Sequence, residues 1–200
     1  MNIIIPASGE GLRFKKAGYT DPKPLINVDS KLKIIDYVIS SFSFDDTFFI
    51  ISSPDTYDSM QDHLYELEEK LPFKYEHLLY DGPKLGPVGC VLGVYDKLKE
   101  ELDEDSDVIV SYCDYGIEWN YDEFLDFIIE VQPDGAIPCY KGYHPHLENE
   151  NNVYAACKVL DSSNKVYAVK EKYKSSDRFN ELWSAGLYYF KSLRIMKDSL

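Results

Sequence analysis

The sequence predicts an α/β fold with a mainly parallel, mixed central sheet, and three observations support this. Short apolar runs alternate along the chain with segments that have the length and patterning of helices. Such alternation is typical of parallel strands joined by right-handed crossovers. After residue 131 the pattern changes to short strands separated by turns, which favours a mixed sheet. The length of 200 residues suits one domain, so we expect residues 1–200 to form a single domain.

The first part of the chain supplies most of the predicted strands and helices. Residues 3–6 are a continuous apolar run, as expected for a strand covered on both faces. Residues 32–42 place their apolar side chains on one side of a helix, and a charged helix begins after Pro54 and extends through 55–71. The other expected elements of this part are strands at 47–52, 73–79 and 107–112 and a helix at 88–98 that GPVG opens.

The second part of the chain is predicted to contain one more helix, at 121–131, followed by short strands. These strands are GAIPCY, VYAACKVL, KVYAVKEK and LWSAGLYYF, at residues 135–140, 153–160, 165–172 and 182–190. DSSN, between the second and third of these strands, is typical of a hairpin turn.

The charge of the chain is strongly acidic but uneven. A formal net charge of −14 argues against nucleic acid or an anionic membrane as the main partner, because both would be repelled. Residues 1–35 nevertheless carry six basic and three acidic side chains. A local cationic region on an acidic protein indicates a small anionic ligand.

The four cysteines are widely spaced, with neither a CxxC pair nor a nearby histidine, so the sequence predicts reduced thiols and no zinc site. The N-terminus has no basic region ahead of a long apolar run, and no segment approaches the length of a membrane span. We therefore expect a cytoplasmic protein that does not bind a membrane. Whether it forms a homo-oligomer is left open.

A glycine loop directly follows the first predicted strand. Gly9 and Gly11 would let backbone N–H groups approach phosphate oxygens, although glycines in a simple tight turn would look the same. The loop is neither a Rossmann fingerprint nor a Walker loop. Arg13 follows the second glycine, and Lys23 lies between two prolines that restrict its backbone. Both cations suit phosphate oxygens.

These residues carry a resemblance to a known family. PASGEGLRF together with DPKPLINV resembles the signature loop of the sugar-phosphate nucleotidyltransferases, the nucleoside diphosphate sugar pyrophosphorylases. The longer stretch IIPASGEGLRFKKAGYTDPKPL is especially similar to members associated with capsule and surface-polysaccharide synthesis. The resemblance implies a Rossmann-like, three-layer α/β/α fold of the GT-A-like type, with a nucleotide half and a mixed-sheet half for the phosphorylated acceptor.

The resemblance also implies roles for single residues on the nucleotide side. Arg13 would hold the β- and γ-phosphates, and Lys23 would steady the α-phosphate during attack. Asp114, which ends the apolar strand DVIVSY, stands where the family carries an aspartate that binds Mg²⁺; an aspartate that only forms a turn is the alternative. The residues implied to surround the nucleotide are Ala7, Gly9 and Gly11 in the loop and Gly86 and Pro87 in KLGPVGCV, where the glycines could also only turn the chain.

On the acceptor side, the KEK segment resembles the family's EK element. Glu171 would accept hydrogen bonds from acceptor hydroxyls, Lys172 would contact the acceptor phosphate, and Gly186 in SAGLYYF would permit close approach of a ligand. The stretch GYHPH offers His144 as a further acceptor contact, or as a residue that only shapes the loop; with His146 it makes an incomplete set for a metal.

The resemblance implies an enzyme that transfers a nucleoside monophosphate from a nucleoside triphosphate to a phosphorylated acceptor and releases pyrophosphate, with Mg²⁺ as cofactor. The alternatives are a nucleotide-binding domain without turnover and a GT-A glycosyltransferase, whose DxD motif has no counterpart in CDYG. One departure from the family matters. A second metal-binding aspartate is expected after SAGLYYF, and no obvious candidate follows it. A catalytic domain that continues beyond this sequence, a substitute ligand and impaired activity each account for this.

Overall fold

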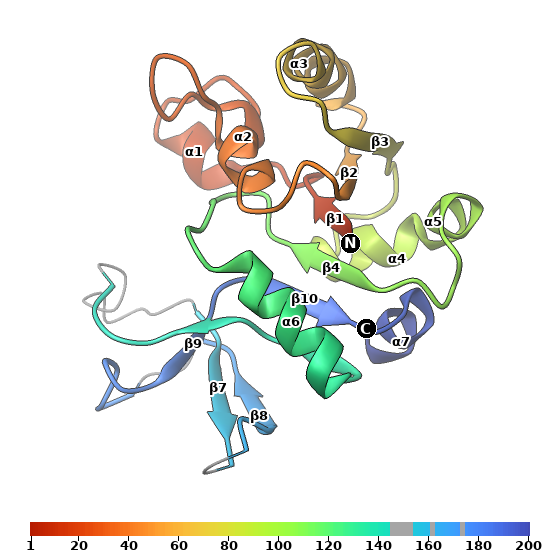
Figure 1. Cartoon of the computed structure of the whole chain (residues 1–200). Coiled ribbons are helices and arrows are strands. Elements are labelled where there is room, and N and C mark those ends of the chain that lie inside the picture. Colours follow the sequence, from red (N-terminus) through yellow and green to blue (C-terminus); the bar gives the residue numbers. More distant parts are fainter. Residues whose placement is uncertain (145–153, 161–162, 173–174) are drawn as a thin grey trace. The chain divides into compact units, whose positions relative to one another are not determined.

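The computed structural model describes residues 1–144, 154–160, 163–172 and 175–200 (Figure 1). The chain forms two compact units: unit 1 comprises Met1–Ala136 and Tyr188–Leu200, and unit 2 comprises Ile137–Leu187. No helix within the described ranges combines the length and apolar character needed to span a membrane.

Unit 1 is built on a sheet of six strands in the order β3, β2, β1, β4, β10 and β5. The first four run parallel to one another, with β1 between β2 and β4, whereas β10 and β5 pair antiparallel. The predicted mainly parallel, mixed central sheet is therefore confirmed. The strands are β1 (Asn2–Pro6), β2 (Thr47–Ser52), β3 (Lys74–Leu79), β4 (Val108–Ser111), β5 (Gly135–Ala136) and β10 (Leu187–Phe190).

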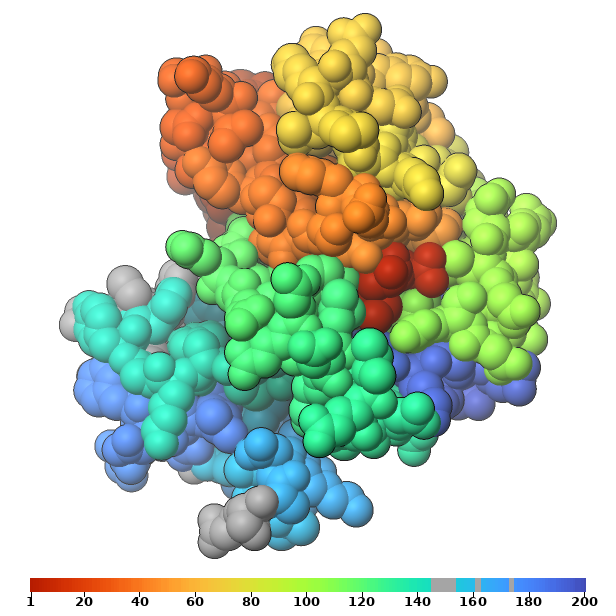
Figure 2. Space-filling model, viewed as in Figure 1, coloured from red at the N-terminus to blue at the C-terminus, as the bar shows by residue number. Residues whose placement is uncertain are grey.

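Helices surround this sheet, which is why its central strands are apolar along their whole length rather than at alternate residues. The helices of unit 1 are α1 (Leu12–Lys16), the 3₁₀ helix η1 (Lys23–Leu25), α2 (Ile34–Ile39), α3 (Tyr57–Glu68), α4 (Gly86–Gly93), α5 (Tyr95–Glu101), α6 (Tyr121–Val131) and α7 (Leu193–Ser199). Most of the N-terminal strand is hidden in the space-filling view, where only a small red area shows between the orange and yellow-green segments (Figure 2).

The two faces of the sheet have separate cores. On one face, Ile4 and Phe49 join a buried cluster with residues of α4, α5 and α7. Side chains of the alternate positions, such as Ile5 and Phe48, are fully buried on the opposite face. There the ring of Phe48 makes an edge contact with that of Phe42, just after α2. The fold is thus the three-layer α/β/α arrangement that the resemblance implied.

Unit 2 contains a four-stranded antiparallel sheet in the order β6, β9, β7 and β8. Trp183, fully buried, forms its core with Ala156, and its indole Nε1 donates to the carbonyl oxygen of Arg178 at 2.7 Å. The pairing of β7 with β8 confirms the predicted hairpin, whereas Asp161 and Ser162 of its turn lie outside the described residues. The strands are β6 (Cys139–Tyr140), β7 (Ala156–Val159), β8 (Val166–Lys170) and β9 (Leu182–Ser184).

Several predicted elements are divided in the structure. The strand expected at 182–190 is two strands, β9 and β10, because Gly186 adopts a left-handed φ of 73° between them. The strand expected at 135–140 is likewise split into β5 and β6, and these belong to different sheets. The helix expected at 88–98 is interrupted at Val94, where α4 ends and α5 begins.

Candidate functional site

The glycine loop leaves the sheet at the carboxyl end of β1. Ala7 is buried, and its N–H donates to the carbonyl oxygen of Ile51 at 2.7 Å, so the loop proper begins after this residue. Gly11 caps α1 with a φ of 61°, in the left-handed region that favours glycine. A Cβ at Gly11 would also lie 3.0 Å from the Cβ of Lys23. Gly11 thus lets the loop pack closely against η1.

Lys23 lies in η1, where the flanking Pro22 precedes the helix and Pro24 is buried within it. Its ammonium Nζ is 2.5 Å from Oδ2 of Asp114, a residue 91 positions further along the chain. The side chain of Lys23 is 22% exposed and that of Asp114 is 36% exposed. The structure therefore brings together the predicted α-phosphate contact and the predicted metal ligand in a partly buried ion pair.

Asp114 follows β4, which pairs in parallel with β1, so both carboxyl ends lie at the same edge of the sheet. Burial raises the pKa of the neighbouring Cys113 thiol to about 12, although the charge of Lys23 partly opposes the shift. The thiol stays protonated near neutral pH, and the negative charge beside Lys23 is that of Asp114.

Arg13 lies on α1, directly after the glycine loop, with its side chain exposed and without an ion pair to any residue that the structure describes. Lys15 and Lys16 are exposed on the same short helix. The loop, α1 and η1 together therefore form a cationic edge beside the carboxyl ends of β1 and β4.

The segment ahead of α4 approaches the glycine loop through an ion pair that the sequence did not predict. Lys84 pairs with Glu10, and its charge and hydrogen bond lower the pKa of that carboxyl. Gly86 begins α4 with a φ of 79°, and Pro87 occupies its first turn. The predicted nucleotide contacts of the loop and of α4 are thus joined by this pair.

Tyr80 holds the chain ahead of α4 in place. Its hydroxyl donates to the carbonyl oxygen of Pro83 at 2.6 Å. A Cβ at either of two glycines would collide with its ring, at 2.6 Å for Gly82 and 2.1 Å for Gly93. These glycines therefore serve the packing of Tyr80.

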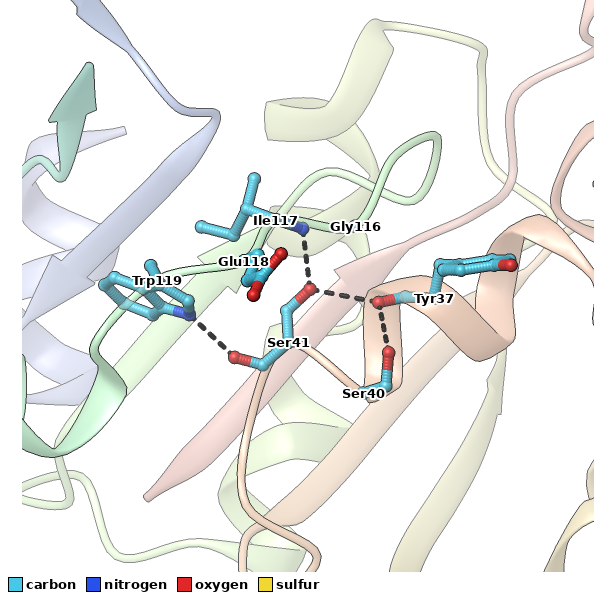
Figure 3. Close-up of a pocket in the computed structure, with 7 residues that line it drawn as sticks. All are labelled: Tyr37, Ser40, Ser41, Gly116, Ile117, Glu118 and Trp119. Carbon is cyan, nitrogen blue, oxygen red and sulfur yellow. Dashed lines mark hydrogen bonds between the residues drawn. The ribbon is translucent and has the colours of Figure 1, made fainter.

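The loop that follows Asp114 is anchored to the end of α2. The N–H of Ile117 donates to Oγ of Ser41 at 2.8 Å, and the indole of Trp119 donates to the carbonyl oxygen of Ser41 at 2.7 Å (Figure 3). A cavity of about 400 Å³ lies at this contact and is lined by Tyr37, Ser40, Ser41, Gly116, Ile117, Glu118 and Trp119. The hydroxyl of Ser41 in turn donates to the carbonyl oxygen of Tyr37 at 3.0 Å. These hydrogen bonds fix the backbone after Asp114.

The predicted acceptor residues lie in unit 2, on separate elements. The ring of His144 lies near those of Tyr140 and Tyr154, with centroid distances of 5.4 and 6.2 Å. Glu171 and Lys172 form the exposed turn after β8, where Lys172 has a left-handed φ of 52°. Gly186 is buried between β9 and β10. His146 lies outside the described residues.

No group of three or more acidic, histidine or cysteine side chains suited to a metal occurs among the described residues. Asp114 would therefore bind a metal ion as a single protein carboxylate. Mg²⁺ in proteins is commonly held by one or two carboxylates, with water and substrate phosphates as its other ligands. Asp114, partly exposed at a strand end and next to a cationic loop, fits that kind of site.

Comparisons with known proteins identify similar chains. The family model described as nucleotidyl transferase matches residues 2–198. The nucleoside-diphosphate-sugar pyrophosphorylase from Vibrio cholerae RC9 is 23% identical, with a TM-score of 0.71 over 94% of this chain and 72% of that one. A proposed glucose-1-phosphate thymidylyltransferase from Bacillus anthracis is 14% identical, with a TM-score of 0.73 over 98% and 72%. HddC from Yersinia pseudotuberculosis is 20% identical, with a TM-score of 0.70 over 98% and 79%. The comparison with curated proteins finds no match.

Proposed function

Because the chain belongs to the nucleotidyl transferase family, we propose that it transfers a nucleoside monophosphate from a nucleoside triphosphate to a phosphorylated sugar or sugar-like acceptor. The observation that carries the proposal is the pairing of Lys23 with Asp114 beside the glycine loop. A lysine and a carboxylate at the open edge of a parallel sheet suit a polyphosphate and its counter-ion. The name of the Vibrio cholerae protein supports a sugar phosphate as the acceptor.

The chemistry needs no nucleophile from the protein. An oxygen of the acceptor's phosphate attacks the α-phosphorus, the bond from that phosphorus to the oxygen bridging to the β-phosphate breaks, and pyrophosphate leaves. A phosphate monoester is already a good attacking group near neutral pH. The task of the protein is therefore to align the two substrates and to neutralise the charge of the triphosphate.

The residues of unit 1 divide this task. Backbone N–H groups of the loop around Gly9 face phosphate oxygens, and the exposed guanidinium of Arg13 binds the β- and γ-phosphates through its planar fork. Lys23 contacts the α-phosphate, where negative charge must be balanced during attack. Mg²⁺, when bound at Asp114, supplies further neutralisation of phosphate oxygens.

The acceptor and the pathway are narrower proposals. We assign the turn at Glu171 and Lys172, with His144 and Gly186, to the acceptor, on the resemblance of KEK and SAGLYYF to family elements. The similarity of the signature loop to capsule-type members supports a role in capsule or surface-polysaccharide synthesis, in the cytoplasm, where nucleoside triphosphates are available.

The test is a matrix of nucleoside triphosphates against phosphorylated acceptors, with Mg²⁺, scored by release of pyrophosphate. At least one pairing should give turnover, and Arg13→Ala and Asp114→Ala should each abolish it without changing the circular dichroism spectrum. Lys16→Ala removes another exposed positive charge from the same helix and should retain turnover. Binding of a triphosphate without pyrophosphate from any pairing would instead identify a nucleotide-binding domain, and full turnover in Asp114→Ala would remove that residue from the site.

A further inference from the structure

The ammonium of Lys23 contacts the carboxylate of Asp114, which is the ligand that a divalent cation would bind. Its Nζ lies 2.5 Å from Oδ2 of Asp114, and the same ammonium is 5.9 Å from the centre of the Phe14 ring. Mg²⁺ binds carboxylate oxygens at about 2.0–2.1 Å, so a metal ion on this oxygen would lie less than about 5 Å from the ammonium of Lys23. Two positive charges this close repel each other strongly in a partly buried site, so binding of the metal ion favours departure of the ammonium from Asp114.

We propose that Lys23 is a built-in cation that neutralises Asp114 in the free protein and exchanges Asp114 for a phosphate when a triphosphate binds. The inference rests on the proposed function and adds to it a coupling between nucleotide binding and metal binding. Each phosphate contact made by Lys23 releases the carboxylate of Asp114 for a divalent ion. Binding of the nucleotide therefore raises the affinity for the metal ion, and the reverse, through Lys23. This coupling adds to the affinity that the metal ion and the nucleotide have for each other in solution.

The surroundings of Lys23 allow this exchange without a change in the fold. The backbone of η1 is held by the buried Pro24 and by the close approach of Gly11 to the Cβ of Lys23. Beyond the Cβ, the side chain is a flexible stem with rotatable bonds that ends in a compact charge. Its ammonium can therefore turn from Asp114 toward the glycine loop while its Cα stays in place.

Asp114 is held equally firmly on its own side. It follows β4, whose residues are all buried, and the loop beyond it is bonded to Ser41. A carboxylate fixed in this way keeps its position when the lysine leaves. The pair is therefore a competition between two cations for one preformed ligand, and removal of the lysine should strengthen metal binding.

Titration with Mn²⁺ alone, followed by the electron paramagnetic resonance signal of the free ion, tests the competition without a nucleotide. Lys23→Met should bind Mn²⁺ about tenfold more tightly than the wild type, within the usual range for coupled sites. Lys16→Met loses the same charge from an exposed position on α1 and should leave the affinity nearly unchanged. The double variant Lys23→Met with Asp114→Asn should not show the increased affinity for Mn²⁺.

A folded Lys23→Met protein that binds Mn²⁺ no better than the wild type overturns the proposal, and so does a gain that survives Asp114→Asn. These outcomes are separate from the proposed function, because no substrate is present. If Lys23→Met binds Mn²⁺ more tightly but the wild type releases no pyrophosphate, the competition is supported and the proposed enzymatic function is contradicted.

A second measurement uses the wild type, in case Lys23→Met does not fold. Limited acylation with acetic anhydride, read by peptide mass spectrometry, reports how accessible and reactive each lysine amine is. Mg²⁺ should raise the acylation rate of Lys23 because it frees the ammonium from Asp114, and the exposed Lys16 serves as the internal reference. An unchanged rate at Lys23, at Mg²⁺ concentrations that fill the site, contradicts the exchange.

Discussion

Gly116 lies so close to α2 that alanine should not fit there. A Cβ at this position would be 2.4 Å from the carbonyl oxygen of Tyr37 and 2.7 Å from its carbonyl carbon. Ordinary contacts need more than 3.4 Å, so the two backbones must separate by about 1 Å. The same carbonyl accepts hydrogen bonds from the hydroxyls of Ser40 and Ser41 at 2.9 and 3.0 Å, and a shift would disturb both.

The expected cost follows from overpacking, which typically destabilises by about 1–3 kcal/mol. In a protein of this size, about 2 kcal/mol lowers the midpoint of thermal unfolding by roughly 4–8 °C. Gly116→Ala should show this decrease when unfolding is followed by far-UV circular dichroism. Gly9→Ala is the matched control, because a Cβ there has no atom within 4 Å and its φ lies outside the left-handed region. A midpoint for Gly116→Ala equal to that of Gly9→Ala would refute the packing argument.

Three further predictions concern other parts of the molecule. Gly9→Ala, although harmless to folding, should raise the KM for the triphosphate roughly tenfold, because its Cβ enters the space proposed for phosphates; an unchanged KM would place the phosphates elsewhere. Burial lowers the pKa of His77 to about 4 from 6.5, so its contribution to stability is complete above 6.5 and is lost as the pH falls toward 4. His77→Gln should therefore flatten the fall in the urea midpoint over that interval, and an identical fall in both proteins would contradict this. Trp183→Phe removes the donor to the carbonyl of Arg178 and leaves a smaller ring, so the free energy of unfolding should drop by about 2–3 kcal/mol in urea titrations; no change would mean that unit 2 unfolds independently of this core.

The sequence was sufficient for the central strands β1 and β2 because burial on both faces requires uninterrupted apolar runs. Ile3–Ile5 and residues 48–51 are such runs, and all are fully or almost fully buried. The points at which predicted helices and strands are interrupted depend on tertiary contacts, which local sequence patterns do not reveal. The helix beginning at Gly86 ends where Gly93 packs on the ring of Tyr80. The short basic helix α1, with no buried residue, has no apolar face that periodicity could detect.

The site shows the same division between local and distant information. Glycines identified the loop and prolines the restricted backbone at Lys23, because their backbone preferences are local. The 3₁₀ helix η1 itself was not predicted. The separate roles of Lys23 and Asp114 were expected from a family resemblance. Their contact was not predicted, since the residues are 91 positions apart and no spacing rule connects them. The pair of Glu10 with Lys84 had no such guide and was missed, although the sequence shows that both flank glycine turns. Both pairs join a cation to a carboxylate across the edge of the sheet. The first pair offsets one positive charge of residues 1–35, whereas the second brings the positive charge of Lys84 to the carboxylate of Glu10, so this region stays cationic. An anionic ligand at Lys23 must first compete with Asp114.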